Sequence, residues 1–131
     1  MHVLIATDGK EAARHAMDEA LRLLPLQQAS VKVTLVSVLD AELRIGGNEN
    51  AQQDLDEGRA FLEKSGVRAA TALRTGKFAD EIVRAGTELN ADLIVLGTEK
   101  ASRLTRALLG SVASDVMLKW SGAVMIVKHQ S

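Results

Sequence analysis

A glycine-containing segment near residue 100 carries residue types that bind anions. Gly97 follows the apolar run 93–96, two residues separate it from Lys100, and nine more precede Gly110 and Ser111. Glycine lets a backbone approach a ligand closely, and apolar residues at spacings of three and four indicate a helix that opens near Ser111. Because the first N–H groups of a helix lack partners, the segment is predicted to form an anion-binding loop. Ser111 could instead act only as a helix cap.

A second polar turn ends the first apolar run of the chain. Residues 2–7 are predicted to form a strand, and Asp8 and Gly9 follow it. Asp-Gly pairs are typical of turns, so the Asp8 carboxylate either faces a ligand or only closes an Asx turn. Both interpretations stay open on the residues alone.

These two turns need a scaffold that brings them together. Hydrophobic periodicity predicts helices at 10–24, 51–65, 78–89 and from 111, and strands at 2–7, 31–39, 67–73, 92–97 and 123–127. The acidic residues Asp54, Asp56 and Glu57 are expected on a solvated helix face. Alternation of strands and helices predicts an α/β fold, a single doubly wound parallel sheet with helices on both faces, in one domain of residues 1–131. Ligands bind such sheets where the strand order reverses. If strand four returns beside strand one, Asp8 and Gly97 share that crevice.

Composition excludes several classes of function. The 131 residues include 16 basic and 17 acidic side chains, three aromatic ones and no cysteine. A net charge of −1 argues against nucleic acid as a partner, and the lack of a long apolar run argues against a membrane. No carboxylate pair or Ser-His-Asp order suggests a catalytic set, and the three histidines, His2, His15 and His129, lie too far apart in sequence to indicate a metal site. We expect a cytoplasmic protein.

Four segments resemble the universal stress protein family. They are Val3 to Gly9, Val36 to Val38, Leu109 to Val112, and Ala123 to Val127. The spacing Gly97, two residues, Lys100, nine residues, Gly110-Ser111 is similar to the nucleotide-binding signature of that family, with lysine in place of the second glycine. The resemblance implies an adenine nucleotide alpha hydrolase-like fold with strand order 3-2-1-4-5.

The resemblance also implies a bound adenine nucleotide, ATP or AMP, with or without Mg. It assigns the adenine contact to the backbone of Val38, the ribose contact to Asp8 and phosphate contacts to the 97–111 segment. The implied binding residues are Ala6, Thr7, Asp8, Val38, Leu96, Gly97, Thr98, Lys100, Gly110, Ser111 and Val112. Three positions depart from the family pattern: Lys100 replaces glycine, Ala113 replaces a hydroxyl residue, and Lys10 replaces the common serine. Affinity is expected to be weakened and not abolished.

The resemblance implies a partner as well. In this family the last strand, here Ala123 to Val127, pairs across a homodimer, and the sequence leaves any further protein partner unknown. Lys100, Arg103 and Arg106 could form a phosphate clamp or a solvated basic face. The alternatives to a nucleotide-binding stress-response regulator are a dimeric interaction module without nucleotide and a slow ATPase.

Overall fold

The computed structural model describes residues 1–39, 50–99 and 111–129. Its elements in chain order are β1 (His2–Ala6), α1 (Glu11–Leu23), β2 (Lys32–Leu39), α2 (Ala51–Lys64), β3 (Ala69–Thr75), α3 (Phe78–Glu88), β4 (Leu93–Glu99), α4 (Ser111–Lys119) and β5 (Ala123–His129). The strands form one five-stranded sheet in the order β3-β2-β1-β4-β5, and every pair is parallel. The predicted fold class and strand order are confirmed.

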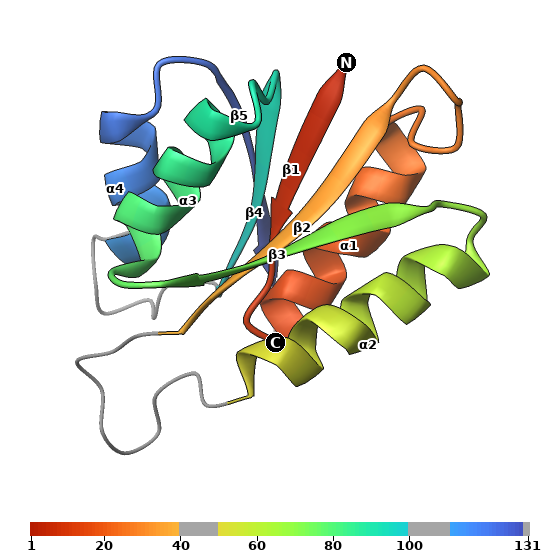
Figure 1. Cartoon of the computed structure of the whole chain (residues 1–131), viewed down its shortest axis with the longest axis horizontal. Coiled ribbons are helices and arrows are strands. Elements are labelled where there is room, and N and C mark those ends of the chain that lie inside the picture. The colour runs from red at the N-terminus through yellow and green to blue at the C-terminus, as the bar shows by residue number, and fades with distance from the viewer. Residues whose placement is uncertain (40–49, 100–110, 130–131) are drawn as a thin grey trace.

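Two layers of helices enclose the sheet (Figure 1). Helices α1 and α2 cover one face, where alternate strand residues such as Val3, Ile5 and Leu35 pack against Met17 and Leu55. Helices α3 and α4 cover the other face, with a core of ten buried residues: Leu4, Val36, Val38, Ala79, Ile82, Ala85, Ile94, Leu96, Ala113 and Val116. The period of two in the strands therefore divides the apolar residues between two cores.

Most element boundaries lie within one residue of the predicted ones. Strands β4 and β5 each run two residues further than predicted, to Glu99 and His129, and β3 is shifted at both ends. The prediction placed this strand at 67–73, whereas it spans Ala69–Thr75. Val67 is buried, but its N–H donates to Leu62 O at the end of α2. This residue belongs to the helix-to-strand connection that follows Lys64 and contains Gly66, whose φ is +79°. A β-branched residue in the core thus looked like a strand residue.

The strand order reverses at β1. This strand pairs with β2 on one side, with Ile5 opposite Leu35, and with β4 on the other, with Ile5 opposite Val95. The connections leaving β1 and β4 therefore start side by side at the carboxyl edge of the sheet. This is the switch point at which doubly wound sheets bind ligands.

Candidate functional site

A cavity of about 270 Å³ opens at this switch point. Residues from all three central strands, the turn after β1, and helices α1, α3 and α4 line it: Ala6, Thr7, Asp8, Lys10, Ala12, Ala13, Val36, Val38, Phe78, Ile82, Leu96, Gly97 and Val112. Seven of the eleven residues predicted from sequence are among them: Ala6, Thr7, Asp8, Val38, Leu96, Gly97 and Val112. The structure therefore brings the Asp8 turn and Gly97 to one cavity.

Two predicted site residues, Thr98 and Ser111, are not among the described residues that line the cavity. Thr98 is buried within β4, and Ser111 begins α4 with an exposed side chain. Lys100 and Gly110 lie outside the described residues, as do Arg103 and Arg106. Ala113, which stands where the family pattern has a hydroxyl residue, lies in α4 and is 3% exposed in the core between the helices α3 and α4 and the sheet. It is also not among the residues that line the cavity.

The turn after β1 has the geometry of an Asx turn. The backbone N–H of Lys10 donates to Asp8 Oδ1 at 3.0 Å, and the N–H of Gly9 donates to Thr7 Oγ1 at 3.2 Å. Gly9 has a φ of +77°, which glycine adopts without strain. Asp8 therefore closes the turn through one carboxylate oxygen while its side chain lines the cavity. A ligand contact by Asp8 remains a prediction that this geometry allows.

Gly97 has a packing role that the sequence did not reveal. A Cβ built on Gly97 would overlap the carbonyl of Ala12 and would lie 3.0 Å from Ala13 N. The first turn of α1 thus approaches β4 so closely that only glycine fits. Because Ala12 and Ala13 also line the cavity, this contact shapes the cavity wall.

Six lining residues were absent from the predicted site. They are Lys10, Ala12, Ala13, Val36, Phe78 and Ile82. Val36 shares a strand face with Val38, and Phe78 and Ile82 are four residues apart on one face of α3. The apolar stripe of α3 was visible in the sequence, but the same stripe also fills the core, so periodicity alone could not mark its end as part of a cavity.

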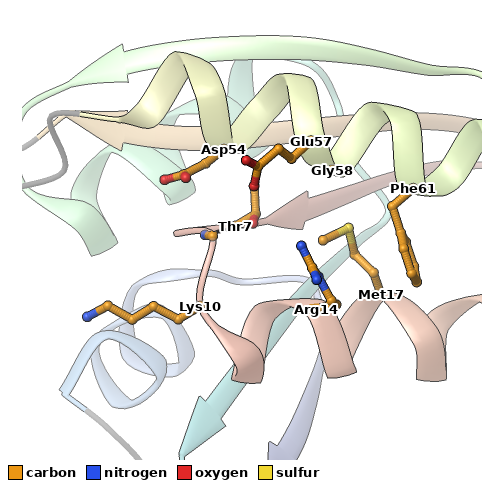
Figure 2. A pocket seen from close by; sticks show the side chains of 9 residues that line it. Thr7, Lys10, Arg14, Met17, Asp54, Glu57, Gly58 and Phe61 are labelled. Carbon is orange, nitrogen blue, oxygen red and sulfur yellow. Dashed lines mark hydrogen bonds between the residues drawn. The ribbon is translucent and has the colours of Figure 1, made fainter.

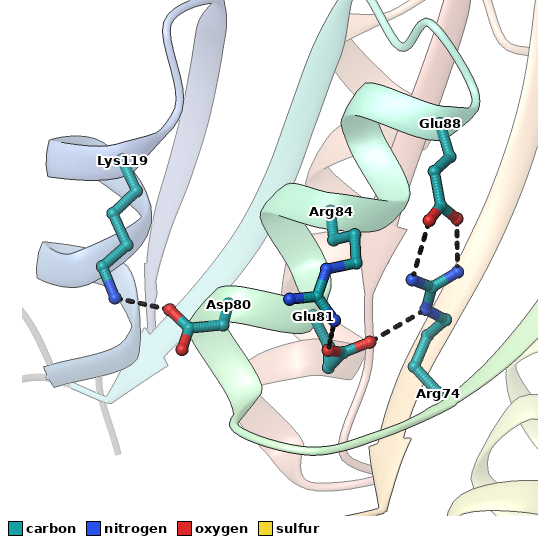
Figure 3. Close-up of polar contacts among 6 residues, drawn as sticks. All are labelled: Arg74, Asp80, Glu81, Arg84, Glu88 and Lys119. Carbon is teal, nitrogen blue, oxygen red and sulfur yellow. Dashed lines mark hydrogen bonds and ion pairs between the residues drawn. The ribbon is translucent and has the colours of Figure 1, made fainter.

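Ion pairs hold α3 in place over the sheet (Figure 3). Glu81 is 7% exposed and accepts hydrogen bonds from Arg74 on β3 at 3.1 Å and from Arg84 at 2.6 Å. Arg74 also pairs with Glu88 at 2.6 Å, which lowers the pKa of the Glu88 carboxyl. These contacts fix the first turn of α3, which carries Phe78.

A small cavity of about 10 Å³ lies on the other side of the β1 turn, between α1 and α2 (Figure 2). Such a volume holds about one water molecule. Lys10 and Arg14 line it from α1 and its cap, and Asp54 and Glu57 line it from α2. The sequence placed Asp54 on a solvated face, but the carboxylate packs against Gly9. Burial, followed by the negative charges of Asp8 and Glu57, raises the pKa of Asp54.

A wider groove of about 800 Å³ lies near the amino ends of β1, β2 and β3. Its residues include His2, whose ring bonds Thr34 Oγ1 at 2.7 Å and Leu89 O at 3.1 Å. This groove faces away from the switch point, so we do not assign the ligand to it.

Two histidines lie close together in another part of the molecule. His129 Nε2 lies 3.3 Å from Glu11 Oε2, and the His129 ring is 5.4 Å from that of His15. Within residues 1–39, 50–99 and 111–129, no three metal-ligating side chains cluster.

The fold and the cavity together define a class: α/β proteins of the adenine nucleotide alpha hydrolase-like type, with a site at the β1/β4 switch point. Within that class, the sequence model of the universal stress protein family matches residues 1–128, and the chain belongs to this family. In the part of the chain that the structure describes, no helix is long and apolar enough to span a membrane.

Three known proteins illustrate the relationship. A universal stress protein of Methanocaldococcus jannaschii is 32% identical, over 96% of this chain and 81% of the relative. The structure of a universal stress protein from Archaeoglobus fulgidus is 26% identical, has a TM-score of 0.78 and covers 98% of this chain and 93% of the other. A structure of the universal stress protein from that organism in complex with dAMP is 25% identical, with a TM-score of 0.75 and 98% of each chain covered.

Proposed function

We propose that this universal stress protein binds an adenine nucleotide, ATP or AMP, in the cavity at the β1/β4 switch point. One observation carries the proposal: Asp8, Val38 and Gly97, which the family resemblance assigns to ribose, adenine and phosphate, come from separate segments and line one cavity of about 270 Å³. A solved relative with 25% identity holds dAMP, which supports the same ligand class for this chain.

The composition of the cavity fits the two ends of a nucleotide. Its apolar residues include Val36, Val38, Phe78 and Leu96, which suit the face of a purine. Thr7, Asp8 and Lys10 give the other part hydroxyl, carboxylate and ammonium groups, which suit ribose and phosphate. With a di- or triphosphate, Asp8, the one carboxylate among the described lining residues, would help to hold Mg, because Mg sites often use one or two carboxylates plus phosphate.

A thermal shift series tests the proposal. A ligand at 100 times its dissociation constant stabilises the folded state by about 2.7 kcal/mol. The unfolding entropy of a chain of 131 residues is roughly 0.28 kcal/mol per degree, so the midpoint should rise by about 10 °C. AMP, ADP and ATP are compared with CMP as the control. Absence of any shift with all three adenine nucleotides at millimolar concentration would reject the proposed ligand.

We further propose that two copies pair through β5. This strand forms one edge of the sheet, and an apolar edge left open would invite pairing with another chain. Leu118, on the helix that precedes β5 in the chain, is 84% exposed and offers apolar surface that a second copy could cover. Light scattering at micromolar concentration should give twice the mass of one chain, and a monomer mass would contradict this arrangement.

The biological role that we propose is regulation of a stress response in the cytoplasm. The protein would act by binding a protein partner, and the bound nucleotide would control that binding. If the nucleotide does not bind, the same dimer would act as an interaction module. A slow ATPase is the remaining alternative, and release of phosphate from ATP by the purified protein would favour it.

A further inference from the structure

Lys10 occupies a fixed position at the polar end of the cavity. Its backbone N–H donates to Asp8 Oδ1 at 3.0 Å, and its carbonyl accepts from Arg14 N at 3.1 Å as the cap residue of α1. The backbone is therefore held at both ends. The residue is exposed and is one of those that line the cavity.

The ammonium group of Lys10 is not used in an internal ion pair within the described part of the chain. Two carboxylates on α2, Asp54 and Glu57, line the small cavity together with Lys10. Figure 2 shows the Lys10 side chain extending away from Arg14, Asp54 and Glu57, and no salt bridge joins it to these carboxylates. Among the described residues, no carboxylate therefore competes with a ligand for this charge.

The main cavity has an uneven distribution of charge. Of its described lining residues, Lys10 is the one cation and Asp8 the one anion, while nine are alanine, valine, leucine, isoleucine or phenylalanine. A cavity with apolar walls and an ammonium at one end suits a ligand with a flat apolar body and an anionic group. A hydrogen bond between ammonium and phosphate is about twice as strong as one between neutral groups.

We propose that Lys10 binds the phosphate of the nucleotide and makes the site select phosphorylated nucleotides over nucleosides. The proposal rests on the proposed function, because it assigns a role within the same site. It also gives a function to a position at which the family pattern commonly has serine and this chain has a charge.

Calorimetric titration with AMP and with adenosine, in buffer containing EDTA, tests the assignment. Wild-type protein should bind AMP more tightly than adenosine. The Lys10→Gln variant should lose about tenfold in AMP affinity and keep its adenosine affinity, because one charge-assisted hydrogen bond disappears. Lys10→Arg should stay within about threefold of wild type for AMP, since the charge is kept. Arg14→Gln is the matched control, because Arg14 lies one turn further along α1 and lines only the small cavity.

The outcomes separate the two proposals. If wild-type protein binds neither AMP nor adenosine, the proposed function fails, and the role of Lys10 fails with it. If AMP binds and Lys10→Gln leaves its affinity unchanged, only the role of Lys10 is wrong. An equal loss for AMP and adenosine would also overturn it, because the residue would then shape the turn without contacting phosphate.

Discussion

Replacing Gly97 by alanine should destabilise the protein even in the absence of ligand. The added Cβ would overlap the carbonyl of Ala12 and approach Ala13 N at 3.0 Å, and both are backbone atoms of α1 that cannot rotate away. Forcing an extra carbon into a packed site costs about 1–3 kcal/mol. With an unfolding entropy of roughly 0.28 kcal/mol per degree for 131 residues, the thermal midpoint should fall by about 4–11 °C.

Calorimetry without nucleotide measures this effect, and Gly58→Ala is the matched control. A Cβ at Gly58 in α2 meets Leu35 Cδ1 at 3.1 Å and Met17 Cε at 3.6 Å, which are the ends of flexible side chains. Alanine also gains about 0.5–1 kcal/mol over glycine within a helix, so this variant should stay close to wild type. If Gly97→Ala has the same midpoint as Gly58→Ala, the glycine does not serve packing, and the close approach of α1 to β4 is wrong.

Two further predictions concern the partly buried Asp54 and the buried Glu81. Asp54→Asn should raise the midpoint at pH 7, because burial and Asp8 raise the pKa of Asp54 above 3.8 and so disfavour its ionised form in the folded state. The gain should vanish as the pH falls below the ordinary carboxyl range, where the wild-type Asp54 is protonated in both the folded and the unfolded state. Asp56→Asn, on the exposed face of α2, is the matched control. Glu81→Gln should lower the midpoint by about 4–11 °C, since two arginine hydrogen bonds to a buried carboxylate are weakened at about 1–3 kcal/mol. Glu88→Gln, at an exposed carboxylate, should lower the midpoint by less than Glu81→Gln does, and equal effects of the two variants in thermal unfolding would contradict the importance of burial at Glu81.

Fold class and strand order could be predicted because the periodicity of the chain changes at each element. Apolar runs of strand length alternate with stripes of period 3.6, and short connections leave few ways to arrange them. The β3 boundary was missed for the same reason, since periodicity reports burial and Val67 is buried within a connection. A local pattern cannot distinguish a buried loop residue from the first residue of a strand.

The candidate site was predictable to the extent that strand ends define it. Asp8 follows β1, and Gly97 lies near the end of β4. The rule that ligands bind at the switch point was therefore enough to predict that the two residues lie close together. Phe78 and Ile82 were missed because a residue at the end of an apolar stripe looks the same whether it faces the core or a cavity. The burial of Ala113 could not be predicted either, because it depends on how α4 packs. Its effect on affinity stays a prediction.

The first turn of α1 links the stability of this protein to its ligand site. Ala12 and Ala13 contact Gly97 through their backbone and also line the cavity, whereas Lys10 lines the cavity with an exposed side chain. A substitution at Gly97 should therefore lower both the unfolding midpoint and the nucleotide affinity, because the wall itself moves. A substitution at Lys10 should lower the affinity alone. Measuring the midpoint and the affinity of both variants therefore distinguishes a packing role for Gly97 from a binding role for Lys10. If Lys10→Gln is as unstable as Gly97→Ala, Lys10 also stabilises the fold, and the two roles are not separate.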